Sequence, residues 1–170
     1  MDAELLRSLQ APLKDRYRNE PAAAVVTLRA EGKLGASISC RVDTGSALVE
    51  AGLHPATGGT GELACSGDML LEALVACAGV TLRTVATALG IELHGGRLRA
   101  EGDLDFRGTL GVAKDAPVGF VAIRLHVDLV TPADAQQIDL LMRLTERYCV
   151  VFQTLRAGVE VGISHTVATG

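Results

Sequence analysis

Two cysteines in apolar segments are the residues of this chain best placed to do chemistry. Cys77 lies at the centre of LLEALVACAGVTL (70–82), whose one charged residue is Glu72, and Cys149 lies in TERYCVVFQTL (145–155). The thiolate form of cysteine is a nucleophile, and a buried thiol ionises only beside a cation or hydrogen-bond donors. Free cysteine is also a common small core residue. The residues alone leave both interpretations open for each thiol.

The sequence around each thiol gives a first hint of its environment. On a helix, Cys77 shares a face with small and hydroxyl side chains, which leave room for a partner helix or a ligand. These are Ala73, Thr81, Thr84 and Ala88. Cys149 follows an expected helix, and if VVFQTL begins a new helix, the unpaired N–H groups there would stabilise a thiolate, with Arg147 close in sequence.

The other two cysteines are interpreted as structural. Cys40 lies on the apolar side of an alternating segment, 34–42, and is expected to be a core residue. Cys65 lies where a glycine-rich loop, 52–67, meets the next helix. A helix N-terminus can lower the pKa of a thiol, so some reactivity at Cys65 stays possible.

Several kinds of site are disfavoured by the motifs. The four histidines and four cysteines contain no C-x₂-C or H-x₃-H pair, so we expect no metal site. The segment GGTGELACSG fits neither phosphate-binding glycine pattern, and G-x-S-x-G is missing. We therefore expect no bound metal, haem, flavin or nucleotide cofactor.

Composition narrows the possible partners. The chain has 170 residues, enough for one domain with a real core, and 48% of them are hydrophobic. Aromatic residues make up 3%, and the net charge is −4, so we expect no nucleic-acid partner. The acidic start MDAELL does not resemble a signal peptide. The longest uncharged apolar run, 73–82, is shorter than the roughly 20 residues that span a bilayer. We expect a cytoplasmic protein with no membrane partner and with free thiols.

Periodicity predicts the elements that position the cysteines. The main one is a helix over 68–89, ended by Gly90 and apolar nearly all round, as in a helix enclosed by other structure. Thr131 is expected to cap a helix that begins at Pro132. The remaining expectations are a helix over 2–17 and strands over 24–30, 34–42, 97–107, 120–129 and 159–167, of which 97–107 and 120–129 form an antiparallel pair. The fold class is α+β with antiparallel sheet.

This combination resembles the OsmC/Ohr family of osmotically inducible and organic-hydroperoxide-resistance proteins. The resemblance rests on DMLLEALVACAGVTL, on ERYCVVFQTL 72 residues after Cys77, and on the two strands between them. It implies an OsmC-like fold, with antiparallel sheets around a buried central helix in an intertwined homodimer. The OsmC-like domain would span 21–170, after an N-terminal helical extension over 1–20.

The resemblance also implies roles for three residues. Cys77 would be the catalytic thiol that attacks an organic hydroperoxide, and Cys149 would resolve the product as a disulfide. Arg29 would pair with the Cys77 thiolate. A thiol or dithiol reductant would then restore the pair.

Two positions depart from the family pattern. Gly67 stands where the family usually has a glutamate, and Val150 stands where proline often follows the second cysteine. A second hypothesis therefore stays open, a non-catalytic OsmC-like dimer that binds a small apolar ligand.

Overall fold

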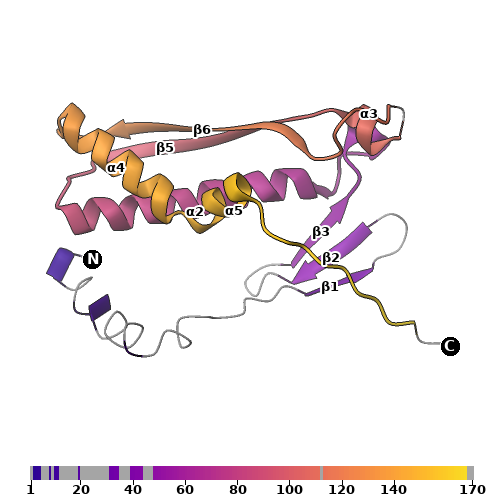
Figure 1. The fold of residues 1–170 in the computed structure, drawn as a ribbon, viewed down its shortest axis with the longest axis horizontal. Coiled ribbons are helices and arrows are strands. Elements are labelled where there is room, and N and C mark those ends of the chain that lie inside the picture. The colour runs from indigo at the N-terminus through magenta and orange to yellow at the C-terminus, as the bar shows by residue number, and fades with distance from the viewer. Residues whose placement is uncertain are drawn as a thin grey trace.

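The described strands form two sheets, one of four short strands and one of two long strands, and the two-stranded sheet packs on the helices (Figure 1). A computed structural model describes residues 2–4, 8, 10–11, 19, 31–34, 39–43, 48–111 and 113–167. The elements are β1 (Glu31–Leu34), β2 (Ser39–Asp43), β3 (Leu48–Gly52), the 3-10 helix η2 (Pro55–Thr57), β4 (Ala64–Cys65), α2 (Ser66–Leu89), β5 (Gly95–Leu104), α3 (Phe106–Thr109), β6 (Phe120–Val130), α4 (Ala135–Tyr148) and α5 (Val150–Ala157). The α+β class with antiparallel sheet is confirmed.

Helix α2 is the central element, as predicted. It ends at Gly90, which takes the left-handed conformation (φ 69°) and donates its N–H to Ala86 and Thr87. Glycine adopts this conformation without steric cost, and so it stops the helix here. The core forms where one face of α2 meets α4 and the loop that follows α2. It consists of Leu82, Val85, Ala86, Ile91 and Leu141.

The opposite face of α2 is open in the single chain. Val80 is 69% exposed, and Ala73 and Ala76 on the same face are also exposed. One copy of the chain therefore leaves part of α2 uncovered, and the enclosure expected within a homodimer stays a prediction. By length and composition alone α2 is apolar enough to cross a bilayer, a test that the core helix of a soluble protein also passes. The uncharged run 73–82 is only part of this helix of 24 residues.

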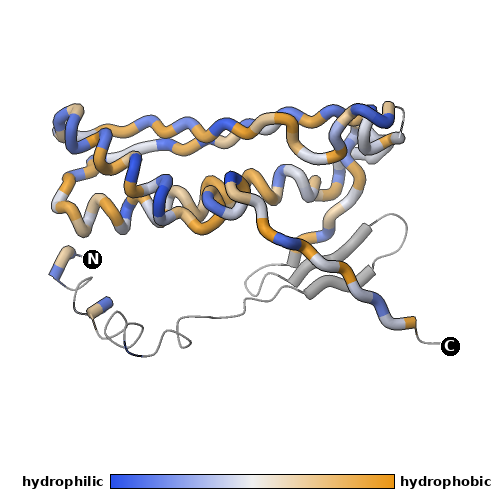
Figure 2. The backbone as a smooth tube through the Cα atoms, viewed as in Figure 1, coloured by the Kyte–Doolittle hydropathy of each residue, from blue (hydrophilic) through white to orange (hydrophobic). Residues whose placement is uncertain are grey.

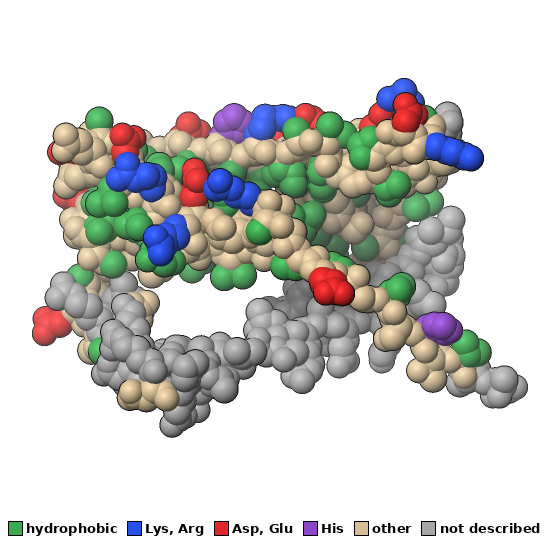
Figure 3. Space-filling view, viewed as in Figure 1, with side chains coloured by type: hydrophobic (Ala, Val, Ile, Leu, Met, Phe, Trp, Pro, Cys, Tyr) green, Lys and Arg blue, Asp and Glu red, His purple; other side chains and the backbone are tan. Residues whose placement is uncertain are grey.

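Strands β5 and β6 form the antiparallel pair that the sequence predicted, with Leu98 opposite Val127 and Ala100 opposite Leu125. Hydrophobic and polar residues alternate along both strands (Figure 2). The polar side chains lie on the exposed face, and charged groups gather along this layer (Figure 3). The apolar side chains are half-buried on the other face, and β5 contacts α2.

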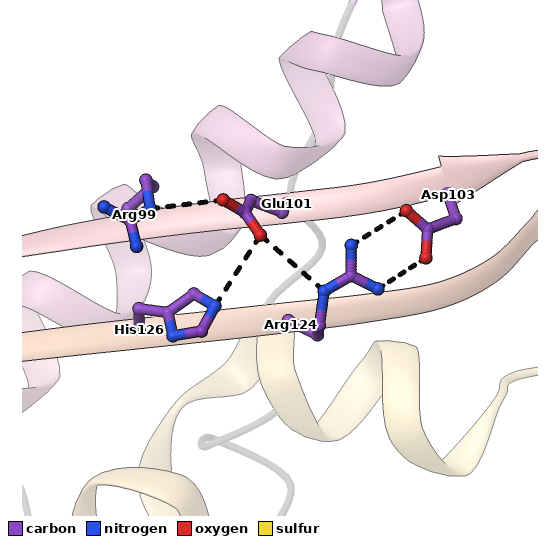
Figure 4. Close-up of polar contacts among 5 residues, drawn as sticks. All are labelled: Arg99, Glu101, Asp103, Arg124 and His126. Carbon is purple, nitrogen blue, oxygen red and sulfur yellow. Dashed lines mark hydrogen bonds and ion pairs between the residues drawn. The ribbon is translucent and has the colours of Figure 1, made fainter.

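Five exposed side chains join the two strands across the polar face (Figure 4). Arg124 donates to both oxygens of Asp103, with Nη2 2.8 Å from Oδ1, and its Nε lies 3.7 Å from Glu101. Arg99 and His126 also lie near Glu101. Arg124 holds the pKa of Asp103 below its usual value, mainly through these hydrogen bonds. Because solvent screens such pairs, they fix strand register more than they add stability.

The strand ends differ from the prediction. Between Asp103 and Leu104 the register shifts, so that Leu104 pairs with Phe120 and Val121 is left over. This irregularity turns Val121 outward, where it is 60% exposed, although strict alternation with Ile123 and Leu125 would place it on the buried face. Phe106 does not continue β5 but begins α3, whose N-terminus is capped by the side chain of Asp105.

The start of α4 was also predicted wrongly. Asp134, not Thr131, is the N-cap: its side chain accepts from the N–H of Gln137, and the Gln137 side chain accepts from the N–H of Asp134. This reciprocal pair of hydrogen bonds satisfies two backbone N–H groups, so the helix begins after Asp134 and not after Thr131. Thr131 instead donates its hydroxyl to the carbonyl of Glu92, fastening the end of β6 to the loop after α2.

Two predicted strands do not form as expected. Residues 34–42 are not one strand: β1 and β2 run antiparallel, with Leu34 opposite Cys40, so the chain reverses inside this segment. Residues 158–167 form no strand and leave the helices as an extended, exposed segment (Figure 1). The predicted strand 24–30 and most of helix 2–17 lie outside the described residues, as do the side chains of β1 and β2.

Gly102 gives a direct test of the β5–β6 packing. A Cβ atom there would lie 2.6 Å from Cδ1 of Phe120, far inside van der Waals contact. We expect Gly102→Ala to lower the free energy of unfolding by about 1–3 kcal/mol, as overpacking does. Gly119→Ala is the control, because a Cβ there meets nothing within 4 Å. Thermal and urea unfolding would measure both, and equal stabilities would contradict the packing described.

Candidate active site

The site begins at a sharp corner between α4 and α5. Cys149 is both the C-cap of α4 and the N-cap of α5, and its extended backbone (φ −74°, ψ 108°) turns the chain between the helices. Its N–H donates to Thr145 at 2.9 Å, and its carbonyl accepts from Gln153 at 3.0 Å. The Gln153 side chain also donates to the carbonyl of Glu146 at 2.7 Å. These bonds hold the corner rigidly.

The corner between α4 and α5 packs against α2. Leu141 and Thr145 of α4 are buried, and both α4 and α5 contact α2. Cys149 is itself only 1% exposed. The first turn of α5 therefore meets α2 in the middle, at Cys77, and the two thiols that lie far apart in the sequence become neighbours.

Cys77 is half-buried and is surrounded by hydrogen-bond donors. Its sulfur accepts from the N–H groups of Val151 and Val150, the thiol of Cys149 and the hydroxyl of Thr81. Burial raises the pKa of the Cys77 thiol, but these hydrogen bonds outweigh burial, and the pKa lies below the ordinary value. Donors stabilise the charged form of a thiol, so Cys77 has the character of a nucleophile.

Cys149 has the opposite character. Burial raises the pKa of its thiol, the N–H of Phe152 opposes this, and the neighbouring Cys77 raises it further. We had expected the N–H groups of a helix starting here to stabilise a Cys149 thiolate. The N–H groups of Phe152 and Val151 do lower the pKa of the Cys149 thiol, but burial and the neighbouring Cys77 outweigh them. The N–H groups of Val151 and Val150 also stabilise the Cys77 thiolate, where the hydrogen bonds outweigh burial. Cys149 is left as a protonated donor beside Cys77.

The other candidate residues are placed as follows. Arg29 lies outside the described residues, so its predicted pairing with Cys77 stays a prediction. Arg147 is exposed, and its guanidinium lies 5.7 Å from the ring centroid of Tyr148. Thr81 lies one turn beyond Cys77 and donates to it. No group of three metal-ligating side chains occurs among the residues described.

A separate cavity lies at the N-terminus of α2. It has a volume of about 360 Å³, and Cys65, Gly67, Asp68 and Phe120 are among its lining residues. Cys65 is the N-cap of α2 but makes no capping hydrogen bond with its side chain. His54 stacks on Phe106 at this cavity, with ring centroids 5.0 Å apart. A Cβ at Gly67 would make only ordinary contacts, the shortest 3.6 Å, so the site has room for a side chain.

The donors at the start of α5 are what sequence reasoning missed. Every residue except proline carries a backbone N–H, so no residue type marks such a donor. The available signal was the position of Cys149 between two helical segments, which located a helix start but not the direction in which it points.

Comparison with known proteins identifies the chain. The sequence profile of the OsmC-like proteins matches residues 59–164, which include both thiols and the strands between them. The chain belongs to the OsmC/Ohr family. A comparison with curated protein sequences gives no match.

Solved structures share the fold of this OsmC-like protein at low sequence identity. An OsmC-like protein from Mycoplasma pneumoniae is 18% identical, with a TM-score of 0.67 over 78% of this chain and 89% of that one. An organic hydroperoxide resistance protein from Elizabethkingia anophelis is 16% identical, with a TM-score of 0.64 over 81% and 93%. One from Legionella pneumophila is 19% identical, with a TM-score of 0.62 over 81% and 94%.

The opposite pKa shifts of the two thiols predict unequal labelling. A lowered pKa leaves more of Cys77 as thiolate at neutral pH, and a raised pKa leaves less of Cys149. Iodoacetamide should therefore alkylate Cys77 faster than Cys149, because the thiolate is the form that reacts. Peptide mass mapping over time would measure it. In denaturant the two rates should become equal, and equal rates in the native protein would contradict the arrangement.

Proposed function

We propose that this protein is a thiol peroxidase that reduces organic hydroperoxides with Cys77 and Cys149. The observation that carries the proposal is the contact between the two thiols, one with a lowered and one with a raised pKa. A lowered pKa suits an attacking thiolate, and a neighbouring protonated thiol suits a resolving residue. The family's organic hydroperoxide resistance proteins support this choice of substrate.

The proposed reaction has three steps. The Cys77 thiolate attacks the terminal oxygen of the hydroperoxide, the O–O bond breaks, and the alkoxide leaves as an alcohol after taking a proton. Cys77 is now a sulfenic acid, and the sulfur of Cys149 attacks it and releases water, which leaves a disulfide. A thiol or dithiol reductant supplies two electrons and two protons to restore both thiols.

The groove along α2 is not next to the thiols. It has a volume of about 460 Å³ and is lined by Asp68, Leu71, Glu72, Val75, Ala76 and Ala100. At 3.6 residues per turn, Cys77 lies on the opposite side of the helix from Asp68 and Val75. The choice of an organic hydroperoxide as substrate therefore rests on the family's organic hydroperoxide resistance proteins and not on this groove.

The cavity at Gly67 favours a second candidate, a non-catalytic ligand-binding function. Gly67 leaves room in this cavity, whose walls combine the apolar side chains of Leu71, Phe106 and Phe120 with the carboxylates of Asp68 and Asp103. This alternative predicts binding of a small apolar molecule that does not depend on either thiol. Cys77→Ser would leave such binding intact while abolishing peroxide reduction, which separates the two functions.

We also propose that the working form is a homodimer. In the single chain the alternating segment 159–167 has no strand partner among the described residues, and Ile163 is 100% and Val161 86% exposed. The open face of α2, at Val80, is also apolar. A second copy that pairs with the segment and covers α2 would remove both surfaces from water.

The peroxidase proposal predicts distinct products for three variants. Cumene hydroperoxide should convert the reduced protein to a form that lacks two free thiols, and hydrogen peroxide should do so more slowly. Cys149→Ser should stop at a sulfenic acid that dimedone traps, and Cys77→Ser should not react. Cys65→Ser is the matched control and should behave as the unaltered protein. Thiol titration and mass spectrometry would follow each product, and consumption of hydroperoxide by Cys77→Ser at the unaltered rate would sink the proposal.

The dimer proposal is tested at Ile163. Sedimentation should find a dimer at micromolar concentration. Because Ile163 is fully exposed in one copy, Ile163→Asp should leave the folded monomer intact while weakening dimerisation by about tenfold or more, equivalent to about 1.4 kcal/mol. Ser164→Asp, the next position along the segment, is the charge-matched control. A stable monomer, or equal effects of both variants, would contradict the proposed interface.

A further inference from the structure

The first turn of α5 has N–H groups that its own helix does not use. The first backbone bond of this helix runs from Gln153 N–H to the carbonyl of Cys149, at 3.0 Å. The N–H groups of Val150, Val151 and Phe152 precede it, and no side chain caps them in the usual way. Helix termini leave such donors for a capping side chain, water or a ligand.

Here the sulfurs of the thiol pair occupy the place of a capping oxygen. The N–H groups of Val150 and Val151 interact with the sulfur of Cys77, and the N–H groups of Val151 and Phe152 interact more weakly with that of Cys149, whose side chain makes no regular capping bond. At Cys77 the donors come from α5 and the sulfur from α2. Hydrogen bonds to an ionised acceptor are about twice as strong as those between neutral groups, so these bonds favour a charged sulfur.

We propose that the N–H groups of Val150 and Val151 hold the Cys77 sulfur in its thiolate form and fix its position, which makes the start of α5 the positioning element of the site. The inference deepens the proposed function, because it names what activates the attacking thiol. Neither side chain is required for this role. The positive end of the α5 dipole acts in the same direction as the two hydrogen bonds.

The arrangement also decides which of the two thiols carries the charge. Cys77 receives both N–H groups, the Thr81 hydroxyl and the Cys149 thiol, and it keeps partial contact with water. Cys149 is 1% exposed and lies beside that sulfur. Two adjacent thiolates would repel each other, so ionisation of Cys77 keeps Cys149 protonated.

Charged side chains on the surrounding elements act more weakly. Among the described residues, the charged side chains on the elements packed around Cys77 are Asp68, Glu72 and Arg83 on α2, Asp139, Arg143, Glu146 and Arg147 on α4, Arg156 on α5, and Arg97, Arg99, Glu101 and Asp103 on β5. All of them are exposed. Solvent screens exposed charges, whereas the two N–H groups lie where α5 contacts α2.

Proline at position 150 removes one donor with little change to the backbone. Val150 is the first helical residue, where proline is well tolerated because its missing N–H has no partner within the helix. Cys149 already has the extended conformation that a residue before proline adopts. Val150→Ala, which shortens the side chain but keeps the N–H, is the reference variant.

The readout is the pH dependence of Cys77 alkylation, measured by peptide mass mapping in the full chain. Relative to Val150→Ala, Val150→Pro should move the midpoint to higher pH and slow alkylation at neutral pH by about fivefold or more, since one charge-assisted bond is lost. A merely structural role for the residue would change the unfolding temperature but not this midpoint. Identical midpoints in the two variants would overturn the inference.

A second measurement needs no proline and covers the case in which Val150→Pro does not fold. In the unaltered protein, the amide proton shifts of Val150 and Val151 should titrate with the same midpoint as Cys77 alkylation. In Cys77→Ser this titration should disappear. Amide shifts that do not follow the thiol midpoint, or that persist in Cys77→Ser, would overturn the inference.

These tests are independent of the peroxidase proposal, because alkylation and amide titration use no hydroperoxide. If the amide titration follows the alkylation midpoint but the protein does not react with cumene hydroperoxide, the peroxidase proposal is overturned and the role of α5 stands. The opposite outcome is also distinguishable. If the protein reduces hydroperoxide but Val150→Pro and Val150→Ala have the same alkylation midpoint, the peroxidase proposal stands and the role of α5 is overturned.

Discussion

The single extended residue between α4 and α5 is the constraint on which the site depends. If Cys149 were helical, α4 would continue, and the next N–H groups would be bonded within it. The extended backbone instead ends one helix, begins another and leaves three unused donors at the new start. Leu141 and Thr145 are buried on the side of α4 that meets α2. The packing of one helix therefore sets where the free donors of the next one point.

The strand pair supports this arrangement from the other side of α2. Cross-strand ion pairs on its outer face fix the register, and its inner face gives α2 a surface to pack on. Near the end of the pair, the register shift and Gly102 make room for the ring of Phe120, which also walls the cavity at Gly67. The sheet thus shapes the N-terminal end of α2, while α4 and α5 shape its middle. The N-terminal end and the middle of the central helix therefore lie in chemically different environments.

Long, uniform patterns were predictable and local choices were not. In helix α2 and in strands β5 and β6, a periodic pattern of hydrophobic residues continues over ten residues or more. A single neighbouring contact does not change the secondary structure of so long a segment. The cap of α4 required a choice between Thr131 and Asp134, and only Asp134 has a glutamine three residues later to complete the reciprocal bond. Segment 34–42 continues its alternation through a chain reversal, so its pattern hides the turn. At the site, Cys77 and Cys149 were recognisable by type, but the N–H donors were not, because backbone donors carry no residue identity.

Burial also determines which of the two sulfurs a molecule from solution reaches first. Cys149 is 1% exposed, so a molecule arriving from solution meets Cys77 first. In the proposed cycle this holds for the reductant as well as the oxidant: an incoming thiol would attack the Cys77 sulfur and expel Cys149. Expulsion is faster when the departing thiolate is well stabilised, and Cys149 is the less stabilised of the two. The same asymmetry that speeds capture of a hydroperoxide would therefore make regeneration the slow half of the cycle and let the oxidised form accumulate.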